Sequence, residues 1–333
     1  MTKQILKNFA LALSLSGLAL IPTTSAAQAG LASRLPGKNP ASAAAQAASH
    51  QAKTPGAPSY TYTLLSFPGS LSTIAIGINP GATTAKTEIV GIAGQNGFLA
   101  TVSGKKTVTE TYKAVNYPHA AQQGGAQGIN DLGQIVGIYV DGSGVSHGYE
   151  LSGGRFTTLD VPFTGAIATF ADGINNSGEV VGGWVDSDRN GHGFTLIGGV
   201  YGSFDFPGGF DTQAFSINSA GDIVGPYNDA SGIAHGFLLS GGTYTSIDFP
   251  EALASIAGGI NDAGDIVGDY CTTSECAATD DWNDGFLLSE GAFTTIAIPG
   301  EIYTIAQEIN NNGVVVGVYG DAAGLVVSFL ATP

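Results

Sequence analysis

The most restrictive feature of this chain is a short pattern that recurs six times. An x-Ile-Asn tripeptide ends at Asn79, Asn130, Asn175, Asn218, Asn261 and Asn310. Successive asparagines are 51, 45, 43, 43 and 49 residues apart. After the last five of them the sequence continues as Asn-x-x-Gly-x-(Ile/Val)-Val-Gly, whereas the first copy carries extra residues. A period of this length predicts an array of similar supersecondary units.

The Asn-x-x-Gly segment between two apolar runs predicts a tight β-hairpin turn. Asparagine accepts a hydrogen bond from the backbone two residues on, and glycine takes the left-handed conformation of a bulged turn. The copy GGINDAGDIVG at 258–268 invites interpretation as an active-site loop. Its near-copies favour a structural turn instead, because an active site normally occurs once. Asp262 and Asp265 are then expected to be solvated turn carboxylates.

Each repeat unit contains four short apolar segments. They lead to x-Ile-Asn (A), through Ile-Val-Gly-x-Tyr (B), through Gly-Phe-Leu-Leu (C), and to a proline (D), as in TYTSIDFP at 243–250. Several B and C segments are apolar on both faces, which is typical of strands buried on both sides. Four strands in about 43 residues, repeated six times, predict an all-β, six-bladed β-propeller. A β-helix would have shorter repeating coils than these units, and a β-sandwich would not require a sequence repeat of about 43 residues.

The two ends of the repeat region predict that the propeller closes into a ring. The last unit stops after its C segment, and YTYTLLSFPG at 60–69 resembles a D segment placed before the first A segment. This N-terminal strand would complete the last blade and remove the sheet edges that an open array leaves exposed. The predicted propeller therefore spans residues 60–333.

The C segments begin with a second recurrent tripeptide. It reads His147-Gly148-Tyr149, His192-Gly193-Phe194 and His235-Gly236-Phe237 in three successive units. Its alternation with Asn-x-x-Gly-x-Ile-Val-Gly over roughly residues 70–330 resembles the HAF-repeat family of bacterial proteins, which are regarded as extracellular. That family has alanine in the middle of the tripeptide, so this chain would be a variant. The resemblance implies an exported repeat protein and carries over no catalytic residue.

Residues 1–29 have the pattern of a secretory signal peptide. Two lysines precede an apolar run over residues 9–21, and residues 27–29 offer a small-x-small cleavage site. The run is shorter than the roughly 20 residues that cross a bilayer, although an uncleaved N-terminal anchor is the alternative. Residues 30–59 are rich in Ala, Pro, Ser and Gln and predict a disordered spacer. We expect a secreted, periplasmic or cell-envelope protein with no membrane insertion after cleavage.

The charge of the chain excludes one class of partner. Residues 60–333 contain six basic residues and all 27 acidic residues, which gives a formal charge of −21. A body this acidic is repelled by phosphate backbones and anionic lipid surfaces, so nucleic acid is excluded as a partner. Only 11% of the chain is charged and 50 residues are glycine, which fits a β-rich repeat protein. We expect a monomer.

Two cysteines and one acidic loop are candidates for a cross-link and a metal site. Cys271 and Cys276 form an even pair in a chain expected to be exported, which favours a disulfide. The segment DSDRNG places Asp186, Asp188 and Asn190 at alternate positions of a calcium-binding loop. The glutamate that such loops carry at the twelfth position is missing. An ordinary acidic hairpin loop is therefore the alternative to calcium.

Three histidines share one repeat position and three aspartates share another: His147, His192 and His235, and Asp160, Asp205 and Asp248. Equivalent positions diverge around a ring, so we expect the histidines to form local hydrogen bonds rather than to share a zinc ion. The aspartates fall on the outer strand, where we expect their charge to discourage sheet-to-sheet association.

The B–C loops are where we expect a ligand to bind. They are acidic, they emerge on the same face as the D–A loops, and the fifth is the longest. Asp281, Trp282 and Asp284 in or beside that loop are the candidate ligand contacts, because loops on a rigid scaffold carry function. We therefore predict an exported, non-catalytic propeller that binds a glycan or an extracellular protein, without a required cofactor. The alternatives are a polysaccharide-active lyase or glycoside hydrolase with its site on the loop-rich face, and a structural surface protein.

Overall fold

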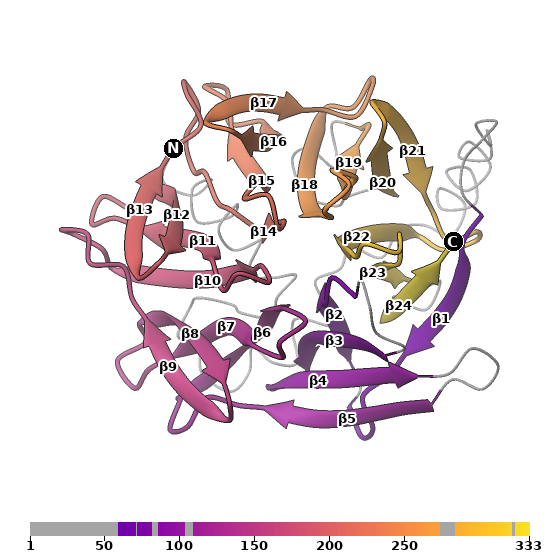
Figure 1. The fold of residues 1–333 in the computed structure, drawn as a ribbon. Helices are drawn as coiled ribbons and strands as arrows, with labels where there is room; N and C mark the ends of the chain where they lie inside the picture. The colour runs from indigo at the N-terminus through magenta and orange to yellow at the C-terminus, as the bar shows by residue number, and fades with distance from the viewer. Residues whose placement is uncertain (1–58, 71, 82–85, 104–108, 274–283, 322–323) are drawn as a thin grey trace.

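Six four-stranded antiparallel sheets form a ring (Figure 1). The computed structural model describes residues 59–70, 72–81, 86–103, 109–273, 284–321 and 324–333. Each sheet is one blade, and its first strand faces the centre of the ring. The six-bladed propeller predicted from the repeat is confirmed.

The strands follow the predicted A to D order in every blade. Blades 1, 2 and 3 consist of β2 (Thr73–Ile78), β3 (Lys86–Ala93), β4 (Asn96–Ser103) and β5 (Thr109–Val115); β6 (Gln122–Ile129), β7 (Ile135–Val140), β8 (Ser146–Ser152) and β9 (Arg155–Leu159); β10 (Ala168–Ile174), β11 (Val180–Val185), β12 (Gly191–Ile197) and β13 (Val200–Phe204). Blades 4, 5 and 6 consist of β14 (Ser216–Ile217), β15 (Ile223–Asn228), β16 (Ala234–Ser240) and β17 (Thr243–Ile247); β18 (Ala254–Ile260), β19 (Ile266–Cys271), β20 (Asp284–Ser289) and β21 (Ala292–Ile296); β22 (Tyr303–Ile309), β23 (Val315–Gly320), β24 (Val326–Thr332) and β1 (Thr61–Leu65).

Antiparallel pairing divides the connections between two faces of the ring. The A–B and C–D turns lie on one side, which we call the turn face. The B–C loops and the D–A loops between blades lie on the other side, the loop face. In blades 2, 3 and 4 the B–C loops are residues 141–145, 186–190 and 229–233.

The ring closes through a strand from the N-terminal side, as predicted. β1 pairs with β24 from Thr61 opposite Thr332 to Leu65 opposite Ser328, and Figure 1 shows the two strands side by side. Ser328 also joins blade 6 to blade 1. Its Oγ donates to the Thr73 carbonyl at 2.6 Å and accepts the Ala75 N–H at 2.8 Å. The sixth blade therefore depends on both ends of the repeat region.

A large aromatic side chain from the third strand of each blade fills the core. These side chains are at most 1% exposed and belong to Phe98, Tyr149, Phe194, Phe237, Phe286 and Phe329. A glycine of the second strand lies opposite each ring, as Gly268 does for Phe286. A Cβ at Gly268 would lie 2.0 Å from the Ile256 carbonyl oxygen and 2.8 Å from the Phe286 ring. The recurrent Val-Gly is thus a packing requirement.

The predicted signal peptide (1–29) lies outside the described residues, as does the predicted spacer (30–59) apart from Ser59. Both remain predictions. Within the part of the chain that the structure describes, no helix is long and apolar enough to cross a membrane.

Candidate functional site

The repeat asparagine of blades 2 to 5 links its blade to the next at the turn face. Asn175 Oδ1 accepts the backbone N–H groups of Ser177 and Glu179 at 3.0 Å, which holds the predicted turn. Its Nδ2 donates to the carbonyl of Asn218 in blade 4 at 3.0 Å. Equivalent donations run from Asn130 to Asn175, from Asn218 to Asn261 and from Asn261 to Asn310. The recurrent turn is therefore structural, as its repetition indicated.

Acidic residues of the turns add further links. Asp262 accepts the backbone N–H of Ser219 at 2.8 Å and the side-chain amide of Asn311 at 2.7 Å, so it joins three blades. Asp265 accepts Nδ2 of Asn261 at 3.0 Å within its own turn. Asp262 is exposed and Asp265 is half-buried, so both turn carboxylates reach solvent as expected, but their hydrogen bonds were not foreseen. A hairpin pattern predicts that a turn residue reaches water, but it does not say which neighbouring blade supplies donors.

Three blades each hold a histidine between two aspartates at the loop face. His192 Nδ1 lies 2.9 Å from Asp205 Oδ1, and its Nε2 lies 3.4 Å from Asp186 Oδ2. Blades 2 and 4 repeat this arrangement with His147, Asp160 and Asp141, and with His235, Asp248 and Asp229. The local hydrogen-bonding role predicted for the histidines is confirmed. The aspartates that follow the outer strands bind these histidines, a role that the expectation of edge repulsion did not include.

Each of these histidines also stacks on an aromatic ring of the second strand. The His192 and Trp184 ring centroids are 4.4 Å apart, and Trp184 packs against Phe163 at 5.0 Å. Trp184 is 8% exposed and its Nε1 donates to Ser203 Oγ at 2.9 Å. Trp184 is therefore a packing residue and not a surface platform for a ligand.

Blade 5 departs from this arrangement. Asp284 occupies the histidine position, and Ala297 occupies the position of its aspartate partner. Asp284 is 5% exposed at the start of β20, and Asp269 of β19 is also 5% exposed. Asp269 Oδ1 accepts the Ala306 N–H of blade 6 at 2.9 Å, and burial raises the pKa of its carboxyl well above the usual range. The predicted ligand contact Asp284 thus lies buried at the base of the longest B–C loop.

The other candidates in that loop are not covered by the structure. Cys271 ends β19 and is 1% exposed. Cys276, Asp281 and Trp282 lie within 274–283, outside the described residues. The disulfide and the ligand contacts of Asp281 and Trp282 remain predictions.

The proposed calcium loop is closed by its own donors. Asp186 Oδ1 accepts the backbone N–H groups of Asp188 and Asn190 at 2.8 Å, and Oδ2 accepts the Asn190 side-chain amide at 2.8 Å. Asp141 and Asp229 build the same turn in loops that have serine in place of Asp188 and an aliphatic residue in place of Asn190. Over the described ranges, no three His, Cys, Asp or Glu side chains group as metal ligands. Calcium would have to displace Asn190 from Asp186.

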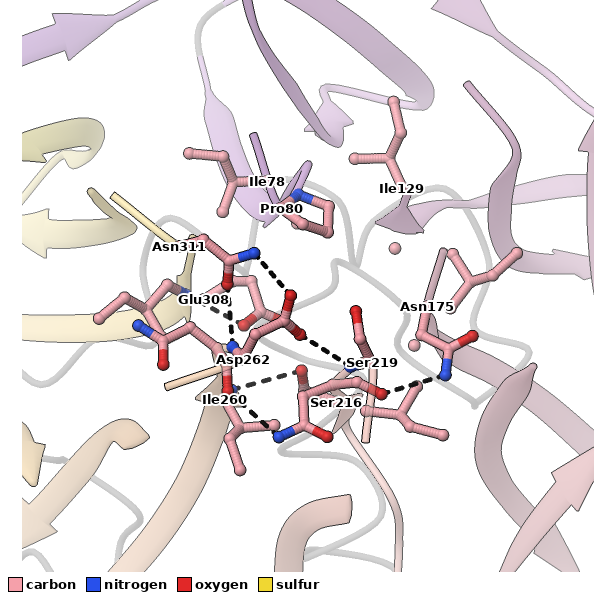
Figure 2. Close-up of a pocket in the computed structure, with 18 residues that line it drawn as sticks. Ile78, Pro80, Ile129, Asn175, Ser216, Ser219, Ile260, Asp262, Glu308 and Asn311 are labelled. Carbon is pink, nitrogen blue, oxygen red and sulfur yellow. Dashed lines mark hydrogen bonds between the residues drawn. The ribbon is translucent and has the colours of Figure 1, made fainter. Parts of the chain in front are cut away.

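A small hollow lies on the axis where the six x-Ile-Asn segments meet (Figure 2). Every blade contributes its isoleucine, namely Ile78, Ile129, Ile174, Ile217, Ile260 and Ile309. Turn residues such as Ser219, Asp262 and Asn311 form the rim. The hollow has room for about 30 Å³, and one water molecule needs about 10–15 Å³. It therefore accommodates about two waters and no sugar ring.

Glu308 is the side chain that breaks the repeat inside this hollow. The equivalent residue two places before the repeat asparagine is small in every other blade: Gly77, Gly128, Gly173, Ser216 and Gly259. Glu308 Oε1 accepts the Ile309 N–H at 3.0 Å, and its carboxyl also hydrogen-bonds to Ser216. Burial raises the pKa of Glu308 from 4.5 to about 8. At neutral pH this carboxyl is therefore mainly protonated and can donate a hydrogen bond.

Asp262 on the rim of the same hollow has the opposite tendency. Burial acts to raise the pKa of Asp262, but hydrogen bonds from Ser219 and Asn311 together lower it. A second acid with a raised pKa lies elsewhere on the inner strands. Asp172 in the β-bulge of β10 accepts Gln213 Nε2 at 2.8 Å, and burial raises its pKa to about 7.

Sequence reasoning missed Glu308 and Asp172, although an alignment of the six A segments contains the signal. For Glu308 the signal is a glutamate where the other five blades have glycine or serine. For Asp172 it is an aspartate directly before that glycine in blade 3.

Comparison with solved structures finds other proteins of similar fold at low identity. AofleA from Arthrobotrys oligospora is 11% identical, with 84% of this chain and 88% of that chain covered and a TM-score of 0.47. A putative TolB from Agrobacterium tumefaciens is 11% identical over 78% and 90%, with a TM-score of 0.46. The fucose-specific lectin from Aleuria aurantia is 10% identical over 78% and 96%, with a TM-score of 0.43. No family model and no curated protein matches the chain.

Proposed function

We propose that the protein is an exported, non-catalytic propeller that binds a glycan or an extracellular protein through its loop face. The break in blade 5 carries this proposal. Asp284 and Ala297 replace the histidine and aspartate that blades 2, 3 and 4 use to tie the third strand to the fourth. This replacement stands at the base of the longest B–C loop. A loop that departs from the repeat on a rigid scaffold is the expected place for binding residues.

The remaining polar groups favour binding over catalysis. The repeat asparagines and histidines bond to the protein itself, and the axial hollow has room for about two waters. Export is supported by the signal-peptide pattern of residues 1–29 and by the resemblance to the HAF-repeat family. The acidic body favours partners other than nucleic acids and anionic membranes.

Loop replacement tests this function. Residues 272–283 of blade 5 are exchanged for DASGI, the B–C loop of blade 4, and parent and variant are applied to a glycan array and to candidate extracellular proteins. A ligand bound by the parent and lost by the variant is expected. The control exchanges residues 321–325 of blade 6 for the same five residues and should keep the ligand. Equal binding by parent and blade 5 variant would contradict the proposal.

A polysaccharide-active lyase or glycoside hydrolase is the second candidate, and one pair of acids at the axial hollow favours it, with the sugar placed over the rim because the hollow itself has room for only about two waters. Glu308, with a pKa of about 8, and Asp262, with a lowered pKa, line one space. Carboxyl groups whose pKa values are driven apart in this way can divide acid and base roles. This pair lies on the turn face, not on the loop face where an enzyme site was expected. Glu308→Gln should then abolish turnover of an array hit and leave its binding intact.

A further inference from the structure

Exposed apolar side chains concentrate on the loop face. The structure describes ten large apolar residues that are well exposed, and six lie in B–C or D–A loops. They are between 36% and 57% exposed and comprise Val145, Ile167, Phe210, Ile233, Leu253 and Leu325. Blades 2 to 6 each contribute at least one of them. We call these six residues the apolar crown.

The crown residues recur at fixed positions of the repeat. Val145, Ile233 and Leu325 end the B–C loops of three blades. Each donates its backbone N–H to the carboxylate of the first aspartate of its loop, and its carbonyl accepts the backbone N–H of that aspartate. Ile167 and Leu253 lie in the D–A loops. Their N–H groups bond to the carbonyls that end the second strand of the same blade, at 2.8 Å and 2.6 Å. Single exposed apolar residues need no explanation, but their recurrence at backbone-anchored sites on one face does.

The turn face is the natural comparison. Its well-exposed large apolar residues among those described are Leu132, Ile197 and Val200, and the last two share one turn. The crown therefore does not reflect a general excess of exposed apolar residues on this molecule.

The loops that carry the crown are also rich in acidic residues. The described loops of this face hold one arginine, Arg189, and eleven acids: Asp141, Asp160, Asp186, Asp188, Asp205, Asp211, Asp229, Asp248, Glu251, Glu301 and Asp321. Backbone N–H groups of the B–C loops lower the pKa of Asp141 and Asp229, which keeps these carboxylates ionised at neutral pH. A second copy of this chain would bring the same charges and be repelled. A positively charged partner is attracted and oriented.

The chemistry of the crown selects among the partners that the proposed function allows. Five of its six side chains are aliphatic, and Phe210 alone offers a flat ring on which a sugar could stack. Aliphatic side chains bury well against other aliphatic groups, and the carboxylates of the same loops suit lysine and arginine.

We propose that the loop face binds a polypeptide whose contact surface combines aliphatic and basic residues. This inference rests on the proposed function and narrows its partner from a glycan or a protein to a cationic, apolar protein surface. The crown supplies apolar burial, and the carboxylates supply attraction and register.

A designed peptide probes this partner chemistry. The full chain is titrated with a synthetic amphipathic peptide of leucine and lysine, and with two matched peptides in which glutamate replaces lysine or serine replaces leucine. Only the leucine–lysine peptide should bind tightly, and its affinity should fall as salt is added. A loop-face variant carrying Phe210→Ser, Leu253→Ser and Leu325→Ser should bind at least about tenfold more weakly, a change of about 1.4 kcal/mol.

The matched control removes the same number of apolar residues from the other face. Leu132→Ser, Ile197→Ser and Val200→Ser together should leave peptide affinity unchanged, and melting curves confirm that both variants fold. Equal losses in the two variants, or equal binding of the glutamate peptide, would overturn the inference. A glycan that is lost when 272–283 is replaced but kept by the loop-face variant would sustain the proposed function and overturn the inference alone. If the peptide binds through the crown but replacing 272–283 changes no ligand binding, the inference would stand and the proposed function of the blade 5 loop would be overturned.

Discussion

Replacing Glu308 by glutamine should stabilise the propeller, and the gain should grow with pH. Burial raises the pKa of this carboxyl from 4.5 to about 8, so the folded chain keeps a proton that the unfolded chain releases above about pH 4.5. Within that window, each pH unit lowers the free energy of unfolding by about 1.4 kcal/mol. The total reaches about 5 kcal/mol above pH 8, an upper bound because the hollow admits water. An amide of the same shape carries no charge, and its oxygen can still accept the Ile309 N–H.

Urea denaturation of wild type and Glu308→Gln measures the effect. At about pH 4 the two proteins should unfold at similar urea concentrations, and the variant should become progressively more stable up to about pH 8.5. Glu290→Gln, in the exposed turn between β20 and β21, controls for the removal of one negative charge from an acidic chain. Parallel pH profiles for wild type and Glu308→Gln would refute the reasoning, because Glu308 would then titrate alike in the folded and unfolded chains.

Four further predictions concern the ring, its packing and its loops. Removing residues 1–57 should leave the melting temperature nearly unchanged, whereas removing 1–69 deletes β1 and should lower it by several degrees or cause aggregation; equal calorimetric traces would argue against closure. Gly268→Ala should lower the free energy of unfolding measured in urea by about 3 kcal/mol, because the new Cβ would clash with the A strand. Gly264→Ala should lower it by only about 1 kcal/mol, because Gly264 has a left-handed φ but open space around it. The reverse order would count against the packing argument. The two cysteines should resist alkylation until reduced, and rapid alkylation of native protein would exclude the bridge. If calcium displaces the Asn190 amide from Asp186, millimolar calcium should raise the melting temperature and Asp188→Ala should abolish the rise; no rise in wild type would remove this loop as a calcium site.

The ring and its seam, the β1–β24 strand pair that closes it, could be predicted because weak local signals recur. One Asn-x-x-Gly segment is an ambiguous loop, but its repetition with four apolar segments per unit leaves few alternatives to a propeller. The unmatched D segment at 60–69 then identified the partner of β24. The histidines followed the same logic, since residues that repeat were expected to bond locally, and they do.

The polar contacts between blades could not be predicted in the same way. Asp262 bonds to residues 43 and 49 positions away, and a hairpin pattern does not say which turns meet at the axis. Glu308 has a raised pKa only because the inner strands converge around it and remove water. Asp284 was placed correctly beside the longest loop, but its burial depends on the packing of blade 5. Repetition therefore predicts the scaffold, and departures from it point to residues whose surroundings only the assembled ring defines.

The seam also determines how the molecule responds to tension. Thr61 lies opposite Thr332, so the N-terminal end of β1 and the C-terminal end of β24 lie side by side. A pull applied to these two ends would unzip the strand pair one hydrogen-bonded step at a time, because the load falls on the outermost bonds first. The ring would open at low force while its other sheets stayed intact. A pull applied across two separate blades would instead meet whole sheets and their packed aromatic cores, so mechanical resistance depends on where the molecule is held.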